Sequence, residues 1–170
     1  LYPKPNFKAR PITKISFLSR LSATEKVGNG FTQLADDLWI FSGHIAPLEN
    51  FKMPEDLADT AKLFLGTPYL YGGRSSFGID CSGLVQQTMM ACGYNCPPRD
   101  ACDQQNAFGS SISVNDSLQR NDIVHFDGHV GIMADETNII NATARHMTTL
   151  MEDISDLQKA YGDIKHITRL

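Results

Sequence analysis

The sequence predicts two structural units in its 170 residues, a small all-β barrel over residues 1–48 and an α+β domain over residues 49–170. Two observations support this division. Between Ile12 and Leu48, short apolar runs alternate with turn residues, as in a barrel of close strands. Helical patterns follow first and alternating strand patterns later, which is the order of an α+β domain with helices packed on an antiparallel sheet.

The first unit is expected to consist of four short strands. They are predicted at residues 15–18, 31–35, 38–41 and 44–48. Turns are expected between them at residues 28–30, 36–37 and 42–43, because glycine, asparagine, aspartate and serine gather there. Residues 49–53 form the expected linker to the second unit.

The second unit is expected to begin with a helix that Pro54 opens and Gly66 ends. A loop with three glycines leads to a second helix, which begins at Asp80 or Cys81 and ends at Gly93. Period-2 alternation after residue 121 then predicts a run of antiparallel strands. The remaining expected elements are a helix at 100–108, strands at 122–126, 129–134, 138–143 and 147–152, a helix at 153–162 and a strand at 164–170.

The composition is that of a globular protein, with 42% apolar and 20% charged residues. The net charge of −4 disfavours nucleic acid and anionic membranes as partners. No apolar run approaches the roughly 18 residues that a membrane span requires. The first ten residues lack the apolar segment of a signal peptide, which favours a cytoplasmic location; because residue 1 is leucine, export is the alternative.

All four cysteines lie between Cys81 and Cys102. Their spacing fits neither a disulfide framework nor a paired Cys-x-x-Cys zinc pattern. We interpret one cysteine as reactive and the others as small buried hydrophobic residues. The alternative is a zinc site formed by three or four cysteines, with His125 as a further ligand. On the first interpretation no metal and no cofactor is needed.

Cys81 is the strongest candidate for a reactive residue. It lies in the first turn of a predicted helix, directly after the glycine-rich loop. The helix dipole and the free backbone N–H groups at this end favour thiolate over thiol, and the thiolate is the competent nucleophile. The alternative is a buried structural cysteine at a helix start.

A thiolate nucleophile needs a partner that handles protons. His129 begins a predicted strand, and Asn141 on the next strand could accept a hydrogen bond from its ring and fix its orientation. Three rivals for this supporting role lie nearby in the sequence: His125, His146 and Asp127.

Three blocks of sequence resemble the NlpC/P60 family of papain-like cysteine peptidases. They read GTPYLYGGRSSFGIDCSGLVQ, RNDIVHFDGHVGIM and IINATA, in the family's order and spacing. Within the family the chain looks most like the bacterial γ-D-glutamyl-L-diamino-acid endopeptidases, which act on peptidoglycan stem peptides. Those enzymes carry SH3-like barrels before the catalytic domain, and residues 1–48 resemble such a barrel.

The resemblance implies a role for each matching residue. Cys81 would be the nucleophile, His129 the base and Asn141 the third catalytic residue, at a position where the family usually has histidine. Tyr69 matches the tyrosine that helps to form the oxyanion site. His125 falls where the family usually has an aromatic residue, which favours a structural role.

The resemblance also implies a substrate-binding group. Asp80 and Ser82 match the residues that bind the free amino group of the terminal L-Ala of the substrate. The alternative for Asp80 is a cap on the helix that follows it. Arg99 matches the family's Arg-Asp block, in which Ala101 replaces a serine that often follows.

The implied activity is that of a thiol protease that cleaves after γ-D-Glu in stem peptides with a free N-terminal L-Ala, as in murein peptide recycling. One alternative is another papain-like amidase or an acyl transferase acting on cell-wall peptides. A second is a non-catalytic cell-wall-binding module.

Overall fold

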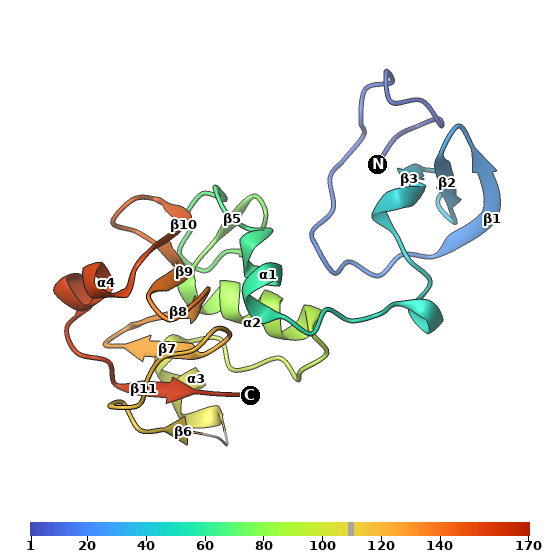
Figure 1. The fold of residues 1–170 in the computed structure, drawn as a ribbon. Coiled ribbons are helices and arrows are strands. Elements are labelled where there is room, and N and C mark those ends of the chain that lie inside the picture. Colours follow the sequence, from blue (N-terminus) through green and yellow to red (C-terminus); the bar gives the residue numbers. More distant parts are fainter. Residues whose placement is uncertain (109–110) are drawn as a thin grey trace. The chain divides into compact units, whose positions relative to one another are not determined.

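The computed structural model describes residues 1–108 and 111–170. The chain divides into two compact units, Leu1–Lys52 and Met53–Leu170, and each is described here by itself (Figure 1). The boundary between them falls within the expected linker at residues 49–53. None of the helices in the described residues is long and apolar enough to cross a membrane.

The N-terminal unit is all-β, with one antiparallel sheet in the order β1-β2-β3. Its strands are β1 (Ala23–Gly28), β2 (Phe31–Leu34) and β3 (Trp39–Phe41), followed by two short 3-10 helices, η1 (Ser42–His44) and η2 (Leu48–Asn50). The small core is formed by buried apolar side chains of β2 and β3. Its members are Phe31, Leu34, Trp39 and Ile40. The assignment of this unit as an SH3-like barrel stays a prediction.

Two of the expected strands in this unit are wrong, and one strand was missed. Residues 15–18 contain a turn in which Leu18 has a φ of 63°, and residues 44–48 contain no strand. The strand β1 was missed because its side chains are mostly exposed and polar; it forms through backbone pairing with β2. The turn between β1 and β2 is as expected, with positive φ at Asn29 and Gly30.

The C-terminal unit is built on a six-stranded antiparallel sheet in the order β10-β9-β8-β7-β11-β6. Its strands are β6 (Ser111–Ile112), β7 (Ile123–Phe126), β8 (His129–Met133), β9 (Asn138–Thr143), β10 (Thr148–Asp153) and β11 (His166–Thr168). The alternation in the sequence therefore predicted every strand except β6, which has only two residues. A further two-stranded hairpin, β4 (Arg74–Ser75) with β5 (Gly78–Ile79), lies in the glycine-rich loop.

Four helices complete this unit. They are α1 (Leu57–Lys62), α2 (Cys81–Ala91), α3 (Ala101–Ala107) and α4 (Ile154–Tyr161). The first helix begins at Leu57 and not at Pro54, because the Asp56 side chain caps it by accepting a hydrogen bond from the Asp59 N–H at 2.8 Å.

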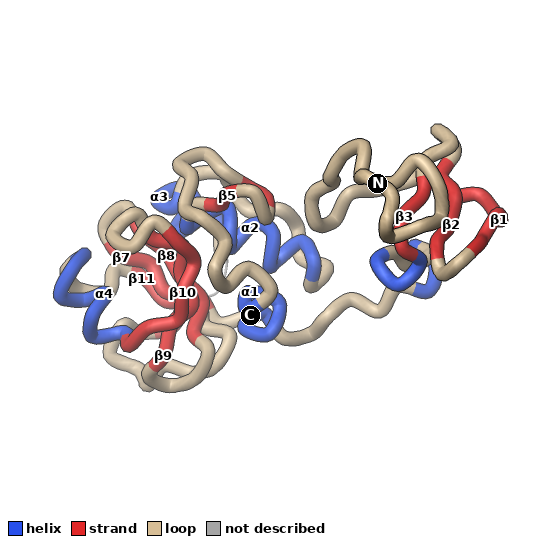
Figure 2. Tube along the Cα trace, turned by 90° about the horizontal axis from the view of Figure 1, so that it is seen from above, coloured by secondary structure: helices blue, strands red, loops and turns tan. Residues whose placement is uncertain are grey.

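Both faces of the sheet are covered. Alternate residues of each strand point to opposite sides, so each face packs against a different set of helices. Val130, Ile132 and Ile140 pack in one cluster with residues of α1 and α2. Met133 and Ile139 pack in a second cluster with Leu157 of α4. Figure 2 shows α4 on the side of the sheet away from α1 and α2. The helix α2 and the strands β8 and β9 carry the three expected catalytic residues.

Candidate active site

Cys81 is the first residue of α2, and its side chain is only 8% exposed. The glycine-rich loop lies directly against this helix start. A Cβ at Gly83 would lie 2.4 Å from the carbonyl oxygen of Gly73, so only glycine allows this approach. Glycine at position 83 therefore lets the loop pack against the start of α2.

The electrostatics of the thiol differ from the sequence-based expectation. Burial raises the pKa of Cys81, and the adjacent Asp80 carboxylate raises it further. Backbone N–H groups, foremost that of Val130, lower the pKa of Cys81 without reversing the shift. Burial and Asp80 therefore act against the thiolate that the start of the helix was expected to favour.

His129 is the first residue of β8 and is buried. Its Nε2 lies 3.0 Å from Oδ1 of Asn141. Its ring stacks on the ring of Tyr161, with the centroids 4.2 Å apart and an interplanar angle of 7°. Burial lowers the pKa of His129 to about 4, although the bond to Asn141 acts in the opposite direction. The ring is therefore neutral at neutral pH.

The structure brings Cys81 to the strand that begins with His129. The thiol lies near the N–H of Val130, the residue after His129, and Cys81 and Val130 belong to one buried cluster. No hydrogen bond joins the Cys81 and His129 side chains among the described residues. Such bonds are often long in a free enzyme and tighten when substrate binds.

Asn141 is the expected partner that the structure joins to His129, and the three rivals lie elsewhere. The ring of His125 packs against Phe108 and His166, each with a centroid distance of 5.8 Å. His146 and Asp127 lie in exposed turns between strands.

Asn141 has a second partner that the sequence did not predict. Its Nδ2 donates a hydrogen bond to Oε1 of Glu152 at 2.9 Å, and Arg145 pairs with the other oxygen of Glu152. The Arg145 guanidinium also lies over the ring of Tyr161, 5.8 Å from its centroid. These residues come together through the register of β9 and β10, which the sequence pattern does not fix.

Asp80 is buried and caps α2, as the alternative predicted, by accepting a hydrogen bond from the Gly83 N–H at 2.8 Å. It also accepts from the Gly72 N–H at 2.7 Å and forms a two-pronged ion pair with Arg99. Although burial acts to raise the pKa of Asp80, these bonds hold it below its usual value. Arg99 also donates to Oγ of Ser82 at 2.8 Å, so the three expected binding residues form one network.

Two buried glutamines that the sequence analysis missed fix the loop that carries Arg99. Gln86 of α2 donates to the carbonyl oxygens of Pro97 and Pro98, at 2.7 and 3.0 Å. Gln104 of α3 donates to the carbonyl oxygens of Pro98 and Ser82, at 2.9 and 3.0 Å. Each glutamine lies on the buried face of a predicted helix. A polar residue at such a position needs a hydrogen-bond partner, and this pattern could have revealed both glutamines from the sequence.

Tyr69 is half-buried and pairs with Ile79, the residue before Asp80, through an isolated β-bridge. Burial raises the pKa of the Tyr69 phenol, with further contributions from Cys81 and Asp80. The phenol is therefore protonated at neutral pH, within electrostatic reach of the thiol, and can act as a hydrogen-bond donor there.

The other cysteines do not match the expectation of small buried residues. Cys96 and Cys102 are exposed, Cys92 is half-buried, and all four cysteines are free. Among residues 1–108 and 111–170, no group of three or more histidine, cysteine, aspartate or glutamate side chains could hold a metal ion.

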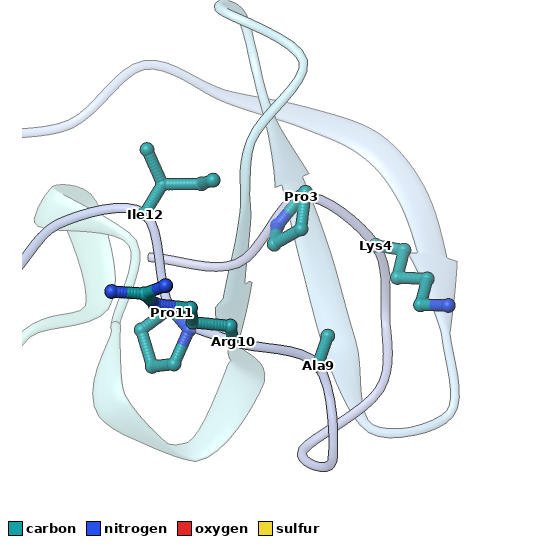
Figure 3. A pocket seen from close by; sticks show the side chains of 6 residues that line it. All are labelled: Pro3, Lys4, Ala9, Arg10, Pro11 and Ile12. Carbon is teal, nitrogen blue, oxygen red and sulfur yellow. The ribbon is translucent and has the colours of Figure 1, made fainter.

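A hollow of about 610 Å³ lies in the N-terminal unit, away from these residues in the chain. Figure 3 shows the side chains that line it: Pro3, Lys4, Ala9, Arg10, Pro11 and Ile12. Two of them are basic, and none is a cysteine, serine, threonine, histidine or carboxylate, so this hollow offers no pair of the cysteine–histidine type.

A cysteine at a helix start, beside a strand whose histidine is held by an asparagine, defines a site of the cysteine-peptidase type. The chain belongs to the NlpC/P60 family, whose sequence model matches residues 66–166, more than half of the chain.

Curated relatives agree with this membership. The chain is 35% identical over 117 residues to gamma-D-glutamyl-L-lysine dipeptidyl-peptidase of Bacillus subtilis, a match that covers 66% of this chain and 38% of that enzyme. It is 33% identical over 115 residues to the probable endopeptidase NlpC of Escherichia coli, covering 60% of this chain and 73% of that protein. The chain thus spans well under half of the Bacillus subtilis enzyme.

Solved structures share the fold. An NlpC/P60 family protein from Bacillus cereus aligns with a TM-score of 0.77 at 22% identity, covering 99% of this chain and 59% of that one. The peptidoglycan hydrolase RipB of Mycobacterium tuberculosis aligns with a TM-score of 0.57 at 22% identity, covering 68% of this chain and 63% of that one.

Proposed function

We propose that this protein is a cysteine endopeptidase that hydrolyses the bond between γ-D-Glu and the diamino acid in peptidoglycan stem peptides. The observation that carries the proposal is the buried Cys81 at the start of α2, which lies beside β8. His129 of β8 is in turn held by Asn141 of β9. The name of the Bacillus subtilis relative, a γ-D-glutamyl-L-lysine dipeptidyl-peptidase, supports the choice of bond.

The reaction starts from a neutral thiol and a neutral imidazole, because the pKa of Cys81 is raised and that of His129 is lowered to about 4. His129 takes the thiol proton as Sγ attacks the carbonyl carbon of the γ-linked D-Glu. The carbon–nitrogen bond to the diamino acid then breaks, and the leaving nitrogen receives the proton from His129. Water hydrolyses the resulting thioester, with His129 again as the base, and restores the thiol.

The negative charge that develops on the carbonyl oxygen needs donors close to Sγ. The backbone N–H groups at the start of α2 point toward this region, and the Tyr69 phenol supplies a further O–H. The raised pKa of Tyr69 keeps that proton in place at neutral pH. Tyr69 therefore acts as an oxyanion donor in the proposed mechanism.

Recognition of a free L-Ala amino group is assigned to Asp80 and Ser82 in this proposal. The Asp80 carboxylate already accepts from Gly72, from Gly83, from the Ser82 hydroxyl and from two nitrogens of Arg99. A carboxylate offers about four acceptor positions, so an ammonium group reaches it by replacing a donor from Arg99. Because the acceptor positions of Asp80 are already occupied, a second candidate function is favoured: an endopeptidase that also cleaves stem peptides whose alanine nitrogen is acylated.

The two candidates separate in an assay with L-Ala-γ-D-Glu-diaminopimelate and its N-acetylated form, followed by mass analysis of the products. We expect release of free diaminopimelate from the first peptide and little from the second. Equal rates on the two peptides would favour the second candidate. If no diamino acid were released from the two diaminopimelate peptides or from the two corresponding lysine peptides, both candidate functions would be contradicted.

A further inference from the structure

The side chain of Asn141 lies between two neighbours on one face of the sheet. On β10, Leu150 is the direct partner of Asn141, and Glu152 lies two residues further along, so it points to the same face. On the other side, β8 supplies His129. The amide thus has Oδ1 at 3.0 Å from Nε2 of His129 and Nδ2 at 2.9 Å from Oε1 of Glu152.

The orientation of this amide determines the state of His129. A neutral imidazole carries one hydrogen, on either Nε2 or Nδ1, and an amide oxygen only accepts hydrogen bonds. With Oδ1 toward His129, the hydrogen lies on Nε2 and Nδ1 is free to accept a proton. If the amide turned over, its NH₂ group would face Nε2 and the hydrogen would move to Nδ1.

His129 itself does not select between the two orientations of the Asn141 amide, because its hydrogen can lie on either ring nitrogen. Glu152 does select between them. A carboxylate only accepts hydrogen bonds, so it selects the orientation in which the NH₂ group faces it. Glu152 is well placed for this, because its side chain is 11% exposed and its other oxygen is paired with Arg145.

We propose that Glu152 is a positioning residue that acts through Asn141 to keep the hydrogen of His129 on Nε2, so that Nδ1 takes the proton of Cys81. This inference rests on the proposed function for its catalytic consequence. The position of the hydrogen on His129, in contrast, can be measured without any substrate.

A simpler role for Glu152 is an ion pair with Arg145 that closes the β9–β10 hairpin. The two roles predict different outcomes for matched substitutions that break the same ion pair. If the ion pair is what matters, Glu152→Gln and Arg145→Met have similar effects. If amide orientation matters, Arg145→Met leaves the Glu152 acceptor in place, so its loss of kcat is expected to be at least about tenfold smaller than that of Glu152→Gln.

Glu152→Gln has a stronger effect for a geometric reason. Arg145 donates to one oxygen of Glu152, so a glutamine there turns its own oxygen toward Arg145 and its NH₂ group toward Asn141. Asn141 then turns over and moves the hydrogen of His129 to Nδ1. The wrong tautomer costs about 10⁴-fold in kcat in Ser–His–Asp enzymes, and we expect a loss of about 10²- to 10⁴-fold with little change in KM.

The double variant Arg145→Met with Glu152→Gln provides a rescue. Without Arg145, the glutamine oxygen is free to accept from Asn141, so kcat is expected to recover at least about tenfold over Glu152→Gln. Glu136→Met, which removes an exposed carboxylate from the β8–β9 turn, is the control for charge alone.

The decisive readout is the tautomer of His129, measured by nitrogen-15 NMR of the imidazole in the resting protein, without any peptide. We expect the hydrogen on Nε2 in the wild type, in Arg145→Met and in the double variant, and on Nδ1 in Glu152→Gln. A wild-type hydrogen on Nδ1, or equal kcat losses in the two single variants, would overturn the inference. Because the NMR readout uses no substrate, failure of the proposed activity is recognised separately, as a wild type that leaves the stem peptide intact.

Discussion

His125 is a buried histidine on β7 whose ring nitrogens have no hydrogen-bond partner within residues 1–108 and 111–170. Burial, together with a smaller contribution from the neighbouring His166, lowers the pKa of His125 to about 4. Phe108 also packs against the ring, with the centroids 5.8 Å apart. A phenylalanine at position 125 would keep the ring packing and remove two unpartnered polar atoms.

The lowered pKa of His125 makes the free energy of unfolding depend on pH. In the unfolded chain the ring binds a proton near pH 6.5, whereas in the folded protein it does so only near pH 4. Above pH 6.5 the ring is neutral in both states, and this titration costs the folded protein no stability. As the pH falls from 6.5 toward 4, the unfolded chain binds a proton that the folded protein does not, so the free energy of unfolding decreases. The difference between the two pKa values corresponds to about 3 kcal/mol in the free energy of unfolding.

The measurement is urea unfolding of the wild type and of His125→Phe between pH 4 and pH 8, followed by circular dichroism. At pH 7 we expect the variant to be more stable by about 1–3 kcal/mol, because two buried unsatisfied nitrogens are removed. The wild type should lose about 3 kcal/mol more than the variant between pH 7 and pH 4. Parallel pH profiles for the two proteins would refute the reasoning, since they would show that His125 does not titrate differently on folding.

Three further predictions concern the site. Cys81→Ser should abolish turnover with circular dichroism unchanged, whereas Cys96→Ser should keep most activity; residual turnover above about a tenth would contradict the nucleophile assignment. The acid limb of kcat/KM should fall near pH 4, since the pKa of His129 is lowered to about 4 and activity needs the neutral ring; a limb near 6.5 would contradict this lowered pKa. Arg99→Met should destabilise the protein by about 2–3 kcal/mol, less than the usual 3–5 for a broken buried pair because the Arg99 side chain is 33% exposed. Adding Asp80→Asn should restore much of that stability, and no restoration would show that the buried charge is not the cause.

The parts of the site that the sequence predicts are those fixed by local rules. A glycine-rich loop followed by an aspartate and an apolar stripe specifies a capped helix, which is why Cys81 was found at the start of α2. The period-2 pattern predicted the strands β8 and β9, which carry His129 and Asn141.

The parts that the sequence did not predict depend on register and burial. Glu152 meets Asn141 because of how β10 pairs with β9, and Tyr161 meets His129 because α4 packs back on the sheet. The direction of the Cys81 pKa shift depends on how deeply the thiol is enclosed, which a position at a helix start does not reveal. The polar strand β1 was missed because its side chains are mostly exposed and give no apolar alternation.

The central claim is that Cys81 forms a thioester with the L-Ala-γ-D-Glu part of a stem peptide. Rapid quenching of the reaction with L-Ala-γ-D-Glu-diaminopimelate, followed by mass analysis of the proteolysed protein, tests it directly. The account predicts that the fragment containing Cys81 gains the mass of the dipeptide less one water, while free diaminopimelate appears in solution. Release of diaminopimelate without this adduct in quenched samples, or an adduct on Cys96 or Cys102 instead, would contradict it.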